Sequence, residues 1–239
     1  MIVPRPAKPQ PSVIEAIIFD FNGVICDDEM IHFQVLQKVL AEEGVKLTAE
    51  QYERDLLGID DQECFRIALG IEDGEPGRVQ SCSLLQRKSA YYFQEIGDHP
   101  PIFPGVADLV REAANLFPLA IASGARRSEV EFVLQRAGLF SQFQVIVAAG
   151  EVSKGKPTPD IFLHALYKLN QKRGGSAPLR ADSTLVIEDS LPGIQAANLA
   201  GMGCLAVANS HPAKVLTSAH HKLPHLKISV SELLALFSS

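Results

Sequence analysis

Four short segments of this chain carry side chains that together could transfer a phosphoryl group. The segments read DFNGV, ASG, KGKPTPD and IEDS, and their polar groups are Asp20, Ser123, Gly124, Lys156, Glu188 and Asp189. An ionised carboxylate can attack phosphorus, while a hydroxyl and a lysine neutralise the dispersed charge of the phosphoryl group. A neighbouring acidic pair suits Mg²⁺, which prefers few carboxylates and retained waters. The residue types therefore indicate phosphoryl transfer.

Asn22 stands two residues after Asp20, where a second carboxylate would form an acid–base pair. An amide does not exchange a proton near neutral pH, so a rate factor of roughly 10²–10⁴ would be lost. Three explanations are open: an introduced substitution, a natural departure in which another group moves the proton, or different chemistry. The groups that could move the proton follow at once, and they are Asp27, Asp28, Glu29 and His32.

Each chemical segment follows a predicted buried strand. Short apolar runs predict strands at residues 13–19, 119–122, 145–148, 184–187 and 204–208, with a weaker candidate at 226–230. Helical patterns separate them at residues 127–137, 159–169 and 192–200. This alternation predicts an α/β fold with a doubly wound parallel sheet, a Rossmann-like core. The carboxyl ends of its strands would bring the four segments to one crevice.

Residues 29–101 differ because they show helical periodicity and no convincing strand. Helices are expected at residues 29–43, 48–57, 61–69 and 78–96. We therefore predict an all-helical cap, residues 29–101, inserted into a core of residues 13–28 and 102–239. Residues 1–12 contain four prolines and no apolar segment of a secretory signal, which predicts a flexible leader.

The composition is that of a globular protein in a reducing compartment. The chain has 239 residues, 46% of them hydrophobic, and a net charge of −6. That charge gives no reason to expect nucleic acid as a partner, and no apolar run approaches the ~18 residues of a membrane span. The four cysteines never form C-x-x-C, which argues against a zinc site and favours a cytoplasmic location. No pattern identifies a protein partner.

The four segments, in this order, resemble the haloacid dehalogenase-like hydrolase superfamily, in the branch of β-phosphoglucomutase and small-metabolite phosphatases. The resemblance covers residues 13–207 or so and includes the helical cap. It implies that Asp20 is a nucleophile that becomes an aspartyl phosphate, and that Ser123 and Gly124 bind phosphate. Lys156, and not Lys154, stands in the G-K-P-x-P-D pattern, so the resemblance implies that it pairs with Asp20 and the phosphoryl group.

The resemblance also implies Mg²⁺ as cofactor and a small phosphorylated metabolite, such as a sugar phosphate, as substrate. The implied metal ligands are Asp20, the main-chain carbonyl of Asn22, Asp189 and, directly or through water, Glu188. Family members often carry D-S-E-x-x-H after the first strand; Glu29 and His32 match this pattern, whereas Asp28 departs from it. Residues 57–61 resemble the specificity loop of the cap. His32, Arg66 and the Arg87–Lys88 pair are candidate substrate contacts, with Lys88 placed for a distal phosphate.

A Mg²⁺-dependent phosphatase is thus the expected function, with a phosphomutase as the alternative. Phosphonoacetaldehyde hydrolases also lack the second aspartate, but they use a cap lysine, and none occurs between Lys46 and Lys88. True haloacid dehalogenases lack it too, but they need no metal, whereas Glu188 and Asp189 are both present. A non-catalytic module that binds a phosphate ligand is the remaining hypothesis.

Overall fold

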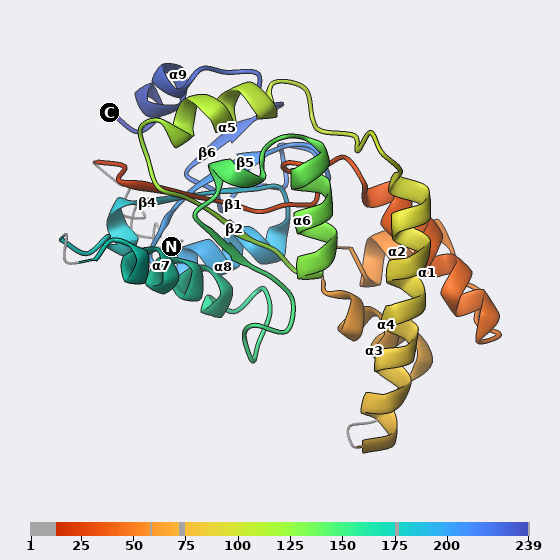
Figure 1. Cartoon of the computed structure of the whole chain (residues 1–239). Coiled ribbons are helices and arrows are strands. Elements are labelled where there is room, and N and C mark those ends of the chain that lie inside the picture. Colours follow the sequence, from red (N-terminus) through yellow and green to blue (C-terminus); the bar gives the residue numbers. More distant parts are fainter. Residues whose placement is uncertain (1–12, 58, 72–74, 175–176, 239) are drawn as a thin grey trace, which may run out of the picture.

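The computed structural model describes residues 13–238 except residues 58, 72–74 and 175–176 (Figure 1). The predicted leader, residues 1–12, and Gly58 of the predicted specificity loop lie outside the described residues. The described part comprises a parallel sheet with helices on both faces and a group of helices at one end of the sheet (Figure 1).

The sheet has six strands, all parallel, in the order β3-β2-β1-β4-β5-β6. Their bounds are β1 Ala16–Phe19, β2 Leu119–Ala122, β3 Val145–Val147, β4 Thr184–Glu188, β5 Gly203–Val207 and β6 His221–Leu223. The direction of winding reverses between β1 and β4, which is the place where ligands bind in such sheets. Phe19 pairs with Ile121 on one side and Ile187 on the other, so the ends of β1, β2 and β4 are level.

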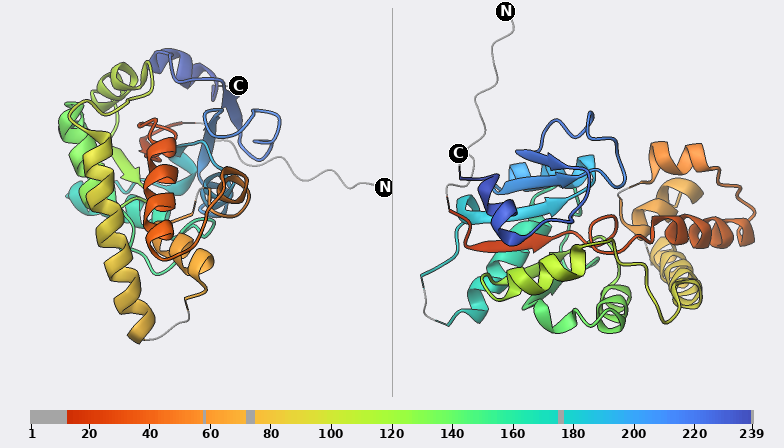
Figure 2. Two further views of the ribbon diagram at one scale, coloured as in Figure 1. Left: turned by 90° about the vertical axis from the view of Figure 1, so that its right-hand side faces the viewer. Right: turned by 90° about the horizontal axis from the view of Figure 1, so that it is seen from above.

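Helices cover both faces because the side chains of each central strand alternate between them. Ile17 and Phe19 of β1 pack against α5 (Val106–Ala114), α6 (Arg127–Arg136) and α9 (Val230–Ala235). Ala16 and Ile18 pack on the opposite face against α7 (Asp160–Lys172) and α8 (Leu191–Leu199). Two short 3₁₀ helices, η1 Phe140–Gln142 and η2 Ala181–Ser183, complete the core. Figure 2 shows the sheet between these two helical layers.

The remaining helices form the cap and follow β1 directly. They are α1 (Glu29–Glu42), α2 (Ala49–Asp55), α3 (Asp61–Leu69) and α4 (Glu75–Ile96). They enclose a cluster of their own that includes Leu36, Leu40 and Phe65, separate from the two clusters of the sheet. In Figures 1 and 2 the cap stands beside the carboxyl ends of the strands. The predicted α/β fold with an inserted helical cap is confirmed, while its boundaries at 28/29 and 101/102 stay a prediction.

The predicted strand at residues 226–230 is wrong. The last strand, β6, lies earlier, and Val230 instead begins α9. The side chain of Ser229 accepts a hydrogen bond from the backbone N–H of Glu232. In return, the carboxylate of Glu232 accepts a hydrogen bond from the backbone N–H of Ser229. This capping box starts a helix in spite of the apolar neighbours. No helix among the described residues is long and apolar enough to cross a membrane.

Candidate active site

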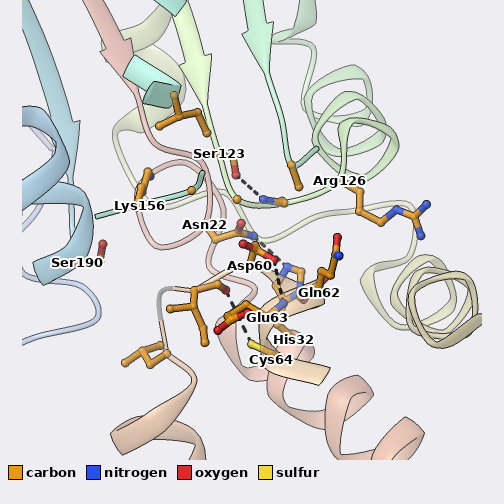
Figure 3. Close-up of a pocket in the computed structure, with 18 of the residues that line it drawn as sticks. Asn22, His32, Asp60, Gln62, Glu63, Cys64, Ser123, Arg126, Lys156 and Ser190 are labelled. Carbon is orange, nitrogen blue, oxygen red and sulfur yellow. Dashed lines mark hydrogen bonds between the residues drawn. The ribbon is translucent and has the colours of Figure 1, made fainter. Parts of the chain in front are cut away.

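The polar residues predicted at the strand ends surround one cavity. Asp20 follows β1, Ser123 follows β2, Lys156 lies in the loop after β3, and Asp189 follows β4. All four line a cavity of about 930 Å³ between the sheet and the cap, and Figure 3 shows Ser123 and Lys156 on its wall. Parallel strands bring their carboxyl ends to one edge, so residues 169 positions apart in the chain share this site.

The ammonium group of Lys156 joins two buried carboxylates. It donates to Asp20 and to the Oε1 atom of Glu188, the latter at 2.6 Å. The other oxygen of Glu188 accepts from the backbone N–H groups of Asp189 and Ser190, each at 2.8 Å. Glu188 is fully buried and does not line the cavity, so its ion pair with Lys156 lies inside the protein. Lys154, in contrast, lies on the surface.

Asp189 approaches the loop after β1 because residue 23 is glycine. Gly23 has a positive φ of 75°, and a Cβ atom there would collide with the carboxylate of Asp189. The Ser210 hydroxyl donates to the same carboxylate, and Asn209 donates to the carbonyl of Gly23 at 2.7 Å. Ser210 was not a predicted site residue, although its position just beyond a predicted strand is a usable signal.

The acidic cluster fits a divalent cation. Carboxylate oxygens of Asp20, Glu188 and Asp189 lie within 4.8 Å of one another, and all three residues are buried. Burial raises the pKa of Asp20 to about 7, although Lys156 opposes the shift. Burial and the charge of Glu188 also raise the pKa of Asp189 well above its ordinary value. The single positive charge of Lys156 does not balance three carboxylates, and a bound cation would neutralise the excess negative charge. Carboxylate oxygens are ligands that suit Mg²⁺.

We expect the metal-free protein to lose stability as the pH rises from about 5 to 8. Asp20 and Asp189 have raised pKa values, so the folded state binds more protons than the unfolded state in this interval, and unfolding becomes easier as they ionise. MgCl₂ should raise the melting temperature, and more at pH 8 than at pH 5. Thermal unfolding in EDTA and in MgCl₂ measures both effects.

The Asp189→Asn variant is the control for this pH dependence. His32 also has a raised pKa, because Asp28 and Asp61 outweigh burial and Lys88, and its effect on stability has the same sign. The variant removes the contribution of Asp189 and leaves that of His32, so the metal-free curve should flatten in part and the shift caused by MgCl₂ should shrink. An unchanged curve would show that the acidic cluster is not its source.

Ser123 and Gly124 offer hydrogen-bond donors to the cavity. The Ser123 side chain is fully buried at the end of β2, and its Oγ accepts from the backbone N–H of Ala125 at 3.0 Å. Its own hydroxyl proton thus remains available for an oxygen of a ligand. Gly124, the next residue in the chain, also lines the cavity. The arrangement suits an anion with several oxygens.

The side chain of Asn22 is bound to a buried carboxylate. Its Nδ2 donates to both oxygens of Asp28, at 2.9 and 3.1 Å, and lies 2.9 Å from Nε2 of His32. Asp28 also accepts from the Tyr92 hydroxyl at 2.6 Å. Burial would raise the pKa of Asp28, but His32, Asn22 and Tyr92 outweigh it and lower this pKa. Where the family pattern has an acid at 22 and a hydroxyl at 28, this chain has an amide and a carboxylate.

Lys88 lies behind the wall of the cavity and not on it. It is almost fully buried, donates to Asp61 at 2.7 Å and lies 2.6 Å from Nδ1 of His32. The predicted contact between Lys88 and a distal phosphate stays a prediction; in this structure Asp61 and His32 surround its ammonium group. Arg87 faces away and pairs with Glu42 and Glu43.

The cap nevertheless contributes polar side chains to the cavity. His32 and Arg66 both line it, and Arg66 donates to Glu63 at 2.5–2.6 Å. Two further residues line it: Asp60, which lies in the predicted specificity loop but was not named by itself, and Arg126, the N-cap residue of α6, which was not predicted. Arg126 forms no ion pair with another described residue, and Figure 3 shows it among the residues that line the cavity. Its place three residues after Ser123 was the available signal.

Comparison with known sequences places most of the chain in one family. A family model described as haloacid dehalogenase-like hydrolase matches residues 14–201. Fructose-1-phosphate phosphatase YqaB of Escherichia coli is 30% identical over 191 residues, 80% of this chain and 95% of that protein. β-Phosphoglucomutase of Bacillus subtilis is 29% identical over 204 residues, 83% and 85% of the two chains. SUPPRESSOR OF QUENCHING 1 of Arabidopsis thaliana is 30% identical over 213 residues; these are 86% of this chain but only 19% of that protein.

Solved structures share the whole architecture. CbbY from Rhodobacter sphaeroides, in complex with phosphate, has a TM-score of 0.79 and 26% identity, with 95% of this chain and 100% of that chain covered. A mutant of the same protein in complex with xylulose-(1,5)bisphosphate gives a TM-score of 0.79 and 27% identity, with the same coverage. The sheet and the cap are thus features that this chain has in common with those proteins.

Proposed function

Because this chain belongs to the haloacid dehalogenase-like hydrolases, we propose that it is a Mg²⁺-dependent phosphatase that acts on a small phosphorylated metabolite. The observation that carries the proposal is the convergence of Asp20, Ser123, Lys156 and Asp189 on one cavity. A carboxylate nucleophile, a hydroxyl donor, a cation and an acidic metal site are the groups that phosphoryl transfer requires. Relatives named as phosphatases support the same reaction.

In this proposal Asp20 attacks phosphorus and carries the phosphoryl group as an aspartyl phosphate, which water then hydrolyses. Ser123, the N–H of Gly124 and Lys156 bind the phosphoryl oxygens. Asp20, Asp189 and the carbonyl of Asn22 would hold the cation, with Glu188 beside them through Lys156 or water. A bound Mg²⁺ supplies positive charge that screens the carboxylate from the phosphate.

The cavity suits a small substrate, and we propose a sugar phosphate. Its volume of about 930 Å³ is at the upper end of ordinary small-molecule sites. The helices of residues 29–101 cover it, and we propose that this cap closes over the substrate and excludes water. His32 and Arg66 line the cap side. Xylulose bisphosphate bound to a structural neighbour supports a substrate with two anionic groups.

Arg126 is the residue that we expect to bind a second anionic group. Replacing it with glutamine should raise the KM for a bisphosphate about 10–100-fold. This factor corresponds to the free energy of one lost hydrogen bond to a charged group. The KM for a monophosphate without other charge should change little. Steady-state kinetics with both substrates measure the difference, and the exposed Lys154→Gln variant controls for the loss of a positive charge. Equal increases for both substrates would contradict this role.

A panel of phosphate esters tests the reaction itself. Fructose 1-phosphate, glucose 1-phosphate, xylulose 1,5-bisphosphate and p-nitrophenyl phosphate are incubated with the protein in MgCl₂ or EDTA, and released phosphate is measured. We expect release from at least one of them in MgCl₂ and none in EDTA. No release from any of them, together with no acid-stable phosphoenzyme, would contradict a phosphatase and favour a binding module.

A phosphomutase is the second candidate because β-phosphoglucomutase is among the relatives. It would share the aspartyl phosphate but return the phosphoryl group to a sugar hydroxyl. Product analysis separates the two: glucose 1-phosphate with a catalytic amount of the bisphosphate should yield inorganic phosphate from a phosphatase and glucose 6-phosphate from a mutase.

A further inference from the structure

The usual proton-transfer position of this site is occupied by a group that cannot transfer a proton. The Asn22 amide nitrogen contacts both carboxylate oxygens of Asp28 and Nε2 of His32. The two ring nitrogens of His32 are engaged as well, Nδ1 with Lys88 and Nε2 with Asn22 and Asp28. Neither Asn22 nor His32 therefore offers a proton to the cavity in this arrangement.

Asp60 reaches the phosphate-binding side of the cavity from the cap. It stands directly before α3, lines the cavity, and approaches two glycines of the core. Its Cα and Cβ atoms lie 3.8 Å from where a Cβ of Gly124 would be, and its Oδ2 lies 3.3 Å from the corresponding point of Gly155. Gly124 follows Ser123 and Gly155 precedes Lys156, so Asp60 lies over the segments that would hold the phosphoryl group (Figure 3).

The other cap carboxylates of the cavity are occupied by side-chain donors. Among the described residues, Glu29 accepts from the Tyr52 hydroxyl, Asp61 from Lys88, and Glu63 from Arg66. Asp60 differs in the same described part of the chain, where its Oδ1 accepts from the backbone N–H of Glu63 at 3.0 Å and no cationic or hydroxyl side chain donates to its carboxylate.

The surroundings of Asp60 shift its pKa upward. Burial, together with the charges of Asp61 and Glu63, raises the pKa of Asp60. A phosphate dianion in the cavity would add a further negative charge and act in the same direction. A neutral carboxyl group next to bound phosphate can donate a hydrogen bond, whereas a carboxylate there would repel the substrate.

We propose that Asp60 is the general acid and base of this active site, in place of the carboxylate that is absent at position 22. The inference rests on the proposed phosphatase function. As Asp20 forms its bond to phosphorus and the ester P–O bond breaks, the leaving oxygen takes the carboxyl proton of Asp60, which becomes a carboxylate. When water attacks the aspartyl phosphate, Asp60 takes its proton while the P–O bond to Asp20 breaks. Inorganic phosphate leaves, and both side chains are restored.

The Asp60→Asn variant tests this role because it separates catalysis from folding. Asparagine is as good an N-cap as aspartate, so the hydrogen bond to the N–H of Glu63 and the start of α3 should be retained. Two classes of substrate are compared: alkyl phosphates, with fructose 1-phosphate as the probe, and p-nitrophenyl phosphate. An alkoxide leaves poorly without a proton, whereas p-nitrophenolate leaves well without one.

We expect the Asp60→Asn variant to lower kcat/KM for fructose 1-phosphate roughly 10²–10⁴-fold, and for p-nitrophenyl phosphate by less than about tenfold. Asp55→Asn removes a carboxylate from the surface of the same cap and should behave like the unmodified protein on both substrates. An equal loss on both substrates, or no loss on either, would overturn the assignment of Asp60. Hydrolysis of neither substrate by the unmodified protein would overturn the phosphatase function itself, and the inference with it.

Discussion

Replacement of Asp20 with asparagine is expected to lower the rate of phosphate release by roughly 10⁴–10⁶-fold, the loss typical of a removed nucleophile. The carboxylate of Asp20 lies at the centre of the predicted site, bonded to Lys156 and within reach of Asp189. An amide of the same shape keeps the geometry but cannot form an aspartyl phosphate. Steady-state phosphate release and acid-quenched phosphoenzyme are the two measurements.

The stability of this variant distinguishes lost chemistry from lost folding. Asp20 is one of three buried carboxylates around a single lysine, so its neutralisation relieves repulsion. The melting temperature of the metal-free variant should be equal to or higher than that of the unmodified protein. Asp27→Asn, seven residues away and exposed, is the matched control and should keep its activity. More than about 1% residual activity in Asp20→Asn would place the nucleophile elsewhere.

Replacement of Asn22 with aspartate is expected to destabilise the protein by about 1–3 kcal/mol near pH 8, because a buried carboxylate loses a hydrogen-bond donor and gains a like charge beside it. In the structure the Asn22 amide lies 2.9 and 3.1 Å from the two oxygens of Asp28. The substitution removes this donor and places a second carboxylate against the first. Chemical denaturation of the single variant measures the loss.

Exchange of the two groups should recover most of that stability. In the double variant Asn22→Asp, Asp28→Asn, one amide and one carboxylate again face each other, and Tyr92 can donate to the amide oxygen at position 28. The double-mutant cycle should therefore show a coupling of more than 1 kcal/mol. Asp27→Asn replaces Asp28→Asn in the matched control cycle, where no coupling is expected.

This cycle also bears on why position 22 carries an amide. If Asn22 were an introduced substitution in a protein built with carboxylates at both positions, the single change to aspartate would be neutral or stabilising. A loss of stability that only the exchange relieves would instead identify Asn22 and Asp28 as a matched pair. The same pair is then the natural departure for which Asp60 compensates.

The sequence was sufficient to predict the fold, the family and the four chemical segments. Alternating apolar strands and amphipathic helices are local patterns, and DFNGV, ASG, KGKPTPD and IEDS each occupy a strand end that parallel topology brings together. The choice of Lys156 and not Lys154 also followed from a local motif. The weak strand at residues 226–230 failed because a capping box, a local signal too, outweighed its apolar character.

The tertiary structure decided which side chains of the cap and of the loops face the cavity. Lys88 is buried against Asp61 and His32, whereas Asp60, from the loop before α3, reaches Gly124 and Gly155. The hydrogen bond from the Asn22 amide to the Asp28 carboxylate depends on the path of the chain between β1 and α1. The physical reason is that these contacts join separate elements: Lys88, Asp61 and His32 come from three helices of the cap, and Asp60 approaches the core from the cap. The relative placement of such elements is set by packing of many side chains, and no periodicity or motif in one segment records it.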